Sequence, residues 1–222
     1  MRTLLLVPIV HTAADLGRLE HSLEQIRSAA MPREKIEASR RQVVRFWDEL
    51  RSAIQRLSLD FTQLVVYQDA LPVVPGHQSG LELKIVHELA AVGSANHLLL
   101  EWLIEQGATL KGTESAELLV AEYTLVRKSI GLADASQPLS EDGSESEDTI
   151  ADQLADLLTS RDQFIAERID KTLLPNQTGI IFLGMLHHLE KWLPDDVHVK
   201  YPMGRPVSPS TIDSENKLPL GS

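Results

Sequence analysis

Hydrophobic residues occur in several short, nearly uninterrupted runs along this chain. Residues 4–9, 64–67 and 179–183 are almost entirely apolar, as expected for strands that are covered on both faces of a parallel sheet. The stretch 107–113 is shorter and has glycines near both ends, whereas residues 197–201 alternate between apolar and polar. The pattern therefore predicts five strands, with the last one at an edge of the sheet.

Between these runs, hydrophobic residues recur at steps of three and four, which is the spacing of an amphipathic helix. One such stripe runs from Leu16 to Ile26, and a second follows Pro32 and runs from Ile36 to Leu57. Proline is tolerated in the first turn of a helix, so Pro32 is predicted to open this second helix. Further helices are predicted over residues 81–92, over residues 95–106, from Glu114 to about residue 128, and over residues 150–169.

Strands that alternate with helices are typical of α/β proteins with a mainly parallel sheet and helices on both faces. The pattern predicts a single domain over residues 1–202, with a long helical hairpin inserted after the first strand. Residues 132–149 include the stretch 140–148, which has five acids and neither a base nor an apolar residue, and this composition predicts a flexible acidic loop over 132–149. The tail 203–222 is rich in Pro, Ser and Gly and is predicted to be disordered.

Composition and charge narrow the classes of partner. The chain of 222 residues has no cysteine, which excludes disulfides and thiolate metal ligands, and a formal net charge of -11. Such a charge disfavours binding to a phosphate backbone, which requires clustered Lys and Arg. No window has the roughly 18 apolar residues of a membrane span, and Pro8 interrupts the apolar start, which we interpret as a strand and not as a signal peptide. We therefore expect a cytoplasmic protein that binds neither nucleic acid nor membrane.

Four predicted strands end in side chains that can bind metals or transfer protons. These side chains are His11, Asp69, Glu114 and the pair His187 and His188. The carboxyl ends of parallel strands lie along one edge of the sheet, where ligands commonly bind. Imidazole and carboxylate ligands suit Mn, Fe, Co or Zn, and a metal held in this way makes hydroxide available for hydrolysis. The metal ligands are therefore predicted among His11, Asp69, His187 and His188.

Each of these side chains also has a structural interpretation. His11 can form a hydrogen bond within a loop, and Asp69 can serve as a turn residue. Glu114 lies at a predicted helix start, where the helix dipole favours a carboxylate. In the pair His187 and His188, one ring can be half-buried while the other faces solvent.

Arg161 interrupts an apolar helical stripe between Leu158 and Ile165. Its guanidinium is therefore expected to point toward the sheet, where pairing with Asp69, Glu114 or an anionic substrate would stabilise the charge. The alternative is a side chain whose charged end reaches solvent at the edge of the helix.

One segment near the C-terminus resembles a known family. The pair Arg161 and Asp162 stands at the start of the helical segment 161–169, and the predicted strand that follows leads into Gly184-Met185-Leu186-His187. This arrangement resembles the C-terminal signature of the TraB/Tiki/erythromycin-esterase/ChaN-like superfamily, in which an Arg-Asp or Arg-Asn pair opens a helix and a Gly-x-x-His motif ends the next strand. The resemblance is confined to about residues 160–194.

The same family carries an N-terminal Gly-x-x-His after its first strand and an acidic residue after its second. In this chain Pro8-Ile9-Val10-His11 takes the first place and Asp69 the second. Pro8 departs from the family's glycine, and the aspartate departs from the more usual glutamate. The resemblance implies a metal-dependent hydrolase, since some members are metalloproteases or esterases, while other members bind haem.

Three functional hypotheses follow. The first is a cytoplasmic metal-dependent hydrolase of the TraB/Tiki type, which cleaves an ester or peptide bond in a small-molecule or peptide substrate. In this hypothesis His11 and His187 bind the metal or transfer protons, Asp69 or Glu114 completes the site or activates water, and Arg161 holds an anionic part of the substrate. The second is a non-catalytic small-ligand-binding or regulatory protein on the same fold. The third is an interaction module that forms a homodimer through the helices of residues 13–57.

Overall fold

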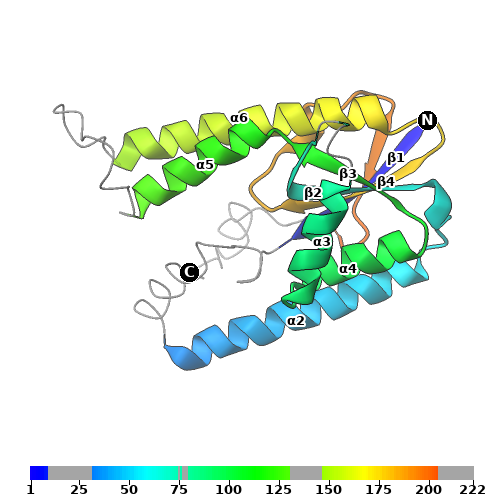
Figure 1. Ribbon diagram of the computed structural model, residues 1–222, viewed down its shortest axis with the longest axis horizontal. Helices are drawn as coiled ribbons and strands as arrows, with labels where there is room; N and C mark the ends of the chain where they lie inside the picture. The colour runs from blue at the N-terminus through cyan, green and yellow to red at the C-terminus, as the bar shows by residue number, and fades with distance from the viewer. Residues whose placement is uncertain (10–31, 75, 77–79, 131–146, 205–222) are drawn as a thin grey trace, which may run out of the picture.

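The computed structural model of this protein describes residues 1–9, 32–74, 76, 80–130 and 147–204 (Figure 1). Its strands are β1 (Arg2–Ile9), β2 (Leu64–Pro72), β3 (Thr109–Glu114), β4 (Thr178–Gly184) and β5 (Val197–Lys200). Its α-helices are α2 (Arg33–Arg56), α3 (Leu81–Ala91), α4 (Ala95–Glu105), α5 (Ala116–Ser129) and α6 (Glu147–Thr172), and two short 3-10 turns are η2 (Phe61–Gln63) and η4 (Leu189–Lys191).

The strands form one parallel sheet in the order β3-β2-β4-β1-β5. The predicted α/β class with a parallel sheet is therefore confirmed, and β5 lies at an edge as its alternating pattern indicated. In the centre of the sheet, Leu4 is paired with Gly179, and Val66 with Ile180. Because all strands run in the same direction, their carboxyl ends share one edge.

Successive strand residues point to opposite faces of the sheet, so strands that are apolar throughout expose apolar side chains on both faces. Helices cover each of these faces. On one face, Leu5 and Val7 of β1 pack in a cluster with Trp47 of α2 and Leu100 of α4. On the other face, the inward-facing side chains in the C-terminal half of α6 belong to a second apolar cluster. Figure 1 shows these two layers, with α2, α3 and α4 below the sheet and α5 with α6 above it.

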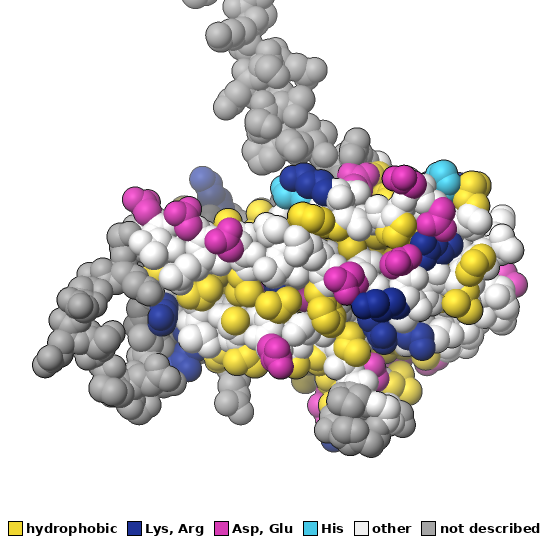
Figure 2. All heavy atoms as spheres, turned by 90° about the horizontal axis from the view of Figure 1, so that it is seen from above, with side chains coloured by type: hydrophobic (Ala, Val, Ile, Leu, Met, Phe, Trp, Pro, Cys, Tyr) yellow, Lys and Arg dark blue, Asp and Glu magenta, His cyan; other side chains and the backbone are white. Residues whose placement is uncertain are grey.

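Helix α5 covers α6 instead of the sheet core, and none of its residues is fully buried. Two large apolar side chains of α5, Val120 and Tyr123, are 66% and 39% exposed. Figure 2 looks down on this side of the molecule, where Asp and Glu side chains are scattered and hydrophobic side chains lie between them.

Several predicted boundaries are confirmed and others need correction. Pro32 lies directly before α2, one residue ahead of the predicted first turn, and Ser94 caps α4. Strand β2 continues to Pro72, beyond its predicted end. The predicted acidic loop 132–149 ends earlier than expected, because residues 147–149 already form the first turn of α6. The other predicted helix after the first strand, the rest of the acidic loop and most of the tail lie outside the described residues.

Candidate metal and acid–base site

Asp69 and Glu114 come from neighbouring strands, and β2 is distorted next to Asp69. Strands β2 and β3 pair in regular register from Val65 to Gln68, and the register then shifts before Pro72. Ala70 lies in this stretch with a φ of 60°, in the left-handed region that side chains rarely adopt. The distortion directly follows Asp69, whose carboxylate accepts a hydrogen bond from Arg161 of helix α6.

Glu114 is the last residue of β3 and is completely buried. Its backbone carbonyl accepts a hydrogen bond from the Val73 amide at 2.8 Å. Two residues earlier, a Cβ atom on Gly112 would lie 2.4 Å from the Pro72 carbonyl oxygen, so β3 can approach β2 here only because residue 112 has no side chain. The alternative interpretation of Glu114, a carboxylate that stabilises a helix start, is wrong: Ser115 caps α5, and the Glu114 carboxylate contacts Arg161.

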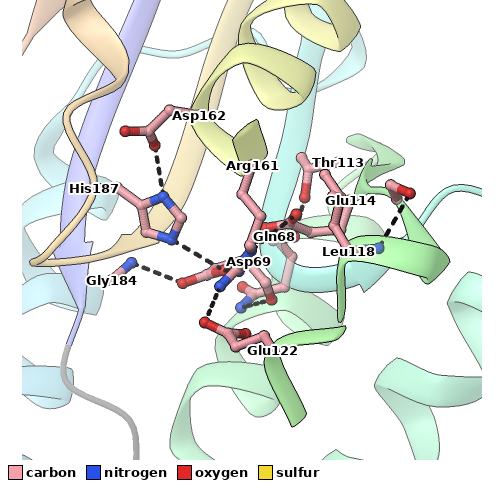
Figure 3. Close-up of polar contacts among 11 residues, drawn as sticks. Gln68, Asp69, Thr113, Glu114, Leu118, Glu122, Arg161, Asp162, Gly184 and His187 are labelled. Carbon is pink, nitrogen blue, oxygen red and sulfur yellow. Dashed lines mark hydrogen bonds and ion pairs between the residues drawn. The ribbon is translucent and has the colours of Figure 1, made fainter. Parts of the chain in front are cut away.

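The guanidinium of Arg161 contacts three carboxylates from three different elements (Figure 3). Its Nη2 donates to Asp69 Oδ1 at 2.8 Å and to Glu114 Oε1 at 2.7 Å, and its Nε donates to Glu114 Oε2 at 3.3 Å. Its Nη1 donates to Glu122 Oε1 at 2.6 Å. The side chains of Arg161, Asp69 and Glu114 are at most 5% exposed, whereas that of Glu122 is 35% exposed. The prediction that Arg161 turns toward the sheet and pairs with Asp69 and Glu114 is confirmed.

His187 lies in the turn after β4, with its ring between Asp162 and Asp69 (Figure 3). Its Nδ1 is 2.6 Å from Asp162 Oδ1, and the other carboxylate oxygen of Asp162 accepts a hydrogen bond from the His188 amide at 2.8 Å. A carboxylate on Nδ1 makes this nitrogen the donor and leaves Nε2 able to accept a proton or bind a metal. The Nε2 atom is 3.7 Å from Asp69 Oδ1, which is too far for a hydrogen bond.

Asp162 and Glu122 were not among the predicted site residues, although the sequence contained a signal for each. Asp162 directly follows Arg161 in the Arg-Asp pair of the family signature, so it belonged to the motif without being given a role. Glu122 lies one helical turn from Leu118 and Leu125 on α5, which places an acid on the half-buried side of that helix. The signal for Glu122 is of the same kind as the one that identified Arg161, a charge at an inward-facing helical position.

Within the described part of the chain, the cluster has more carboxylates than cations in a region with little solvent. One guanidinium faces the carboxylates of Asp69, Glu114 and Glu122, and Asp162 adds a fourth acid beside His187. Burial raises the pKa of Glu114, and the nearby charge of Asp69 raises it further. The hydrogen bond and the charge of Arg161 lower this pKa, but they do not cancel the rise. Burial disfavours the charged form of Arg161, but Glu114 and the other carboxylates outweigh it and raise the pKa of the guanidinium. A further cation or a proton would reduce this imbalance.

Three of the predicted residues supply a compact set of potential metal ligands. One ligand atom each from Asp69, Glu114 and His187 can be chosen so that all lie within 4.8 Å of one another. Carboxylate oxygens and an imidazole nitrogen suit first-row divalent metals. Arg161 does not exclude such an ion, since a carboxylate has about four lone-pair sites and can serve both partners.

The structure does not bring every predicted residue together. His188 is exposed, and its ring is not part of the cluster; the His188 backbone amide contacts Asp162 instead. His11 lies outside the described residues, so its predicted role stays a prediction. The convergence of Asp69, Glu114 and His187 from three strand ends nevertheless agrees with the predicted placement at one edge of the sheet.

Comparisons with known proteins identify no relative. No family model, curated protein or solved structure matches this chain, so the resemblance to the TraB/Tiki-like superfamily stays a prediction. Within the described ranges, no helix combines the length and the apolar character needed to cross a membrane.

Proposed function

We propose that this protein is a metal-dependent hydrolase of the TraB/Tiki type in which Asp69, Glu114 and His187 hold a divalent cation. The observation that carries the proposal is the 3.7 Å gap between His187 Nε2 and Asp69 Oδ1. Two atoms that ligate one ion at about 2.0–2.2 Å lie roughly 3–4 Å apart. When His187 is neutral and Asp69 is ionised, both atoms are acceptors, so a cation between them is favourable.

The charge balance of the cluster supports the same proposal. Among the described residues, Arg161 is the only guanidinium that contacts these three carboxylates, so the described part of the cluster has more acids than cations. Isolated buried charges are costly unless they are paired or coordinate a metal. A divalent cation would compensate the excess and would favour the ionised form of Glu114.

The protein's own residues would prepare this site for chemistry. Asp162 fixes the His187 ring through Nδ1 and so directs Nε2 toward the carboxylates. Arg161 holds Asp69 and Glu114 side by side, which reduces their repulsion. A divalent cation, when bound, lowers the pKa of its water toward ~7 and supplies hydroxide for cleavage of an ester or peptide bond.

The substrate-binding role expected for Arg161 requires a change of partner. All three of its nitrogens already donate to carboxylates. Glu122 is the most exposed of these acids, so an anionic substrate group would replace Glu122 and not Asp69 or Glu114.

A non-catalytic ligand-binding or regulatory protein is the second candidate, and one observation favours it. All nitrogens of the Arg161 guanidinium are paired with protein carboxylates, as is also expected in an ion network with a purely structural role. Such networks perturb pKa values without taking part in catalysis. The two candidates differ in whether a metal-loaded protein hydrolyses any substrate.

The test is metal binding followed by a hydrolysis screen. We expect calorimetric titration of Mn²⁺ or Zn²⁺ into protein stripped with chelator to show one site per chain. The variant His187→Ala should bind the ion at least tenfold more weakly, because one of three protein ligands is lost. The metal-loaded protein should then cleave members of an ester and peptide panel.

A matched control is His198→Ala, which removes an exposed histidine on the edge strand β5. This variant should bind metal as the unchanged protein does. Equal affinity in all three proteins would refute the metal site. Metal binding at this site without hydrolysis across the panel would favour the non-catalytic candidate.

A further inference from the structure

A pocket of about 390 Å³ lies behind the Asp162–His187 pair. Figure 3 shows Asp162 on the far side of the His187 ring from Asp69, and Asp162 is one of the residues that line this pocket, whereas Asp69, Glu114 and His187 do not line it. Its volume falls within the range of about 300–1,000 Å³ that is typical of small-molecule sites. The proposed function does not use this pocket.

Apolar side chains from three elements form part of the pocket wall. Leu158 comes from α6, Leu186 from the turn after β4, and Trp192 from the residue after η4. Leu186 is 76% exposed and Trp192 is 42% exposed. A ligand with an apolar body would remove this surface from water, which is the main favourable contribution to binding of such ligands.

One charged group of the pocket, the Lys191 ammonium, can pair with an anion. Its lining contains the titratable residues Asp162, His188 and Lys191. Both oxygens of Asp162 are already engaged, by the His187 ring and by the His188 amide. Among the residues that the structure describes, no carboxylate pairs with the Lys191 ammonium and no partner bonds the His188 ring. The Lys191 ammonium is therefore the group in the pocket wall with which a ligand carboxylate could pair, although Asp162 also lines the pocket and the whole chain has a net charge of -11.

We propose that this pocket binds a small carboxylate with an apolar body, such as a medium-chain fatty acid or an aryl carboxylate. The apolar body lies against Leu158, Leu186 and Trp192, and the carboxylate pairs with Lys191 beside the His188 ring. The inference does not depend on the metal site, because none of its contacts involves Asp69 or Glu114.

The test uses octanoate as the probe and chelator-treated protein, so that a failure of the metal proposal cannot affect it. Trp192 is 42% exposed, whereas Trp47 is 4% exposed, so a ligand in the pocket should produce a saturable change in tryptophan fluorescence. We expect this change to be lost in Trp192→Phe. Calorimetry should show that octanamide, which has the same apolar body without the charge, binds more weakly than octanoate.

Lysine variants test the charge contact. Lys191→Ala should weaken octanoate binding roughly fivefold, as expected from the loss of a partly exposed ion pair of about 1 kcal/mol, and Lys191→Arg should restore most of it. Lys84→Ala, on the exposed side of α3, is the matched control and should have no effect. Equal binding of octanoate and octanamide, a fluorescence change that survives in Trp192→Phe, or no saturable binding up to about 10 mM would each overturn the proposal.

Discussion

Two buried arginines lie at opposite ends of the sheet, and their surroundings differ. Arg2 opens β1, and its guanidinium donates to Asp170 and Asp196 and to the backbone carbonyls of Asp170 and Leu173. Its two carboxylate partners are 50% and 56% exposed. Arg161, at the carboxyl end, contacts three carboxylates, and two of these are at most 4% exposed.

The comparison separates a contact that holds elements together from one that concentrates charge. Around Arg2, the acids remain hydrated, so the pairing joins β1, α6 and the segment before β5 at little electrostatic cost. Around Arg161, Asp69 and Glu114 are removed from water and Glu122 adds a third acid, an arrangement that stability alone does not require. These buried acids lie at the edge where parallel sheets commonly bind ligands, and they support the proposed metal site.

The largest expected effect is on stability when Arg161 is removed. Arg161→Met should lower the free energy of unfolding by about 3–5 kcal/mol, because it leaves buried carboxylates without their partner. Arg2→Met should cost less, since its two aspartates can return to water. Urea denaturation followed by circular dichroism would measure both.

The matched control for these variants is Lys171→Met, which removes an exposed cation from the same helix α6. It should change the free energy of unfolding by less than about 0.5 kcal/mol. Similar losses for Arg2→Met and Arg161→Met would remove the difference on which the comparison rests.

A second, smaller effect is expected on metal affinity when Asp162 is changed. Asp162→Asn keeps the size of the side chain but removes the carboxylate that fixes the Nδ1 proton of His187. Loss of such a supporting partner typically weakens metal binding 10–100-fold. Calorimetry with Mn²⁺ would measure this change.

Asp170→Asn is the corresponding change beside Arg2 and should leave metal affinity unaltered, because Asp170 lies at the other end of the sheet. A metal affinity that Asp162→Asn leaves unchanged would contradict the proposed orientation of His187.

The smallest effect is a difference in the sign of the pH dependence at the two arginines. Burial raises the pKa of Glu114 above its ordinary value of 4.5, so its contribution to stability is full below that pH and is lost as the pH rises through the raised pKa. The hydrogen bond from Arg2 lowers the pKa of Asp196 below 3.8, so its contribution is present above 3.8 and is lost as the pH falls.

The variants Glu114→Gln and Asp196→Asn isolate these contributions. As the pH rises, the free energy of unfolding of Glu114→Gln should increase relative to that of the unchanged protein. That of Asp196→Asn should decrease relative to that of the unchanged protein. Urea denaturation over roughly pH 3 to 8 would measure both differences. Differences of the same sign would show that the two arginine sites have equivalent electrostatics.

Much of the fold could be predicted because buried strands and amphipathic helices leave a regular pattern in the sequence. The apolar runs identified β1, β2 and β4, and the alternation in residues 197–201 placed β5 at an edge. The exact ends were harder to predict, since the distortion at Ala70 extends β2 past Asp69 through a backbone conformation that residue types alone do not indicate.

The candidate site was predicted only in part. Strand ends indicated Asp69, Glu114 and His187, and the interrupted stripe indicated Arg161, because each signal is local in the sequence. The pairing of Asp162 with His187 joins residues 25 positions apart, and the contact of Glu122 depends on how α5 packs on α6. Such contacts are set by tertiary packing, which sequence spacing does not specify.

The most direct test of the central claim is a crystal structure of the protein grown with Mn²⁺, with anomalous scattering used to locate the ion. We expect one strong anomalous peak bonded to His187 Nε2 and to the carboxylates of Asp69 and Glu114. Arg161 should remain in contact with both acids, as it is without the ion. Crystals that show no peak among these three side chains, or a peak elsewhere with this cluster unchanged, would contradict the proposed metal site.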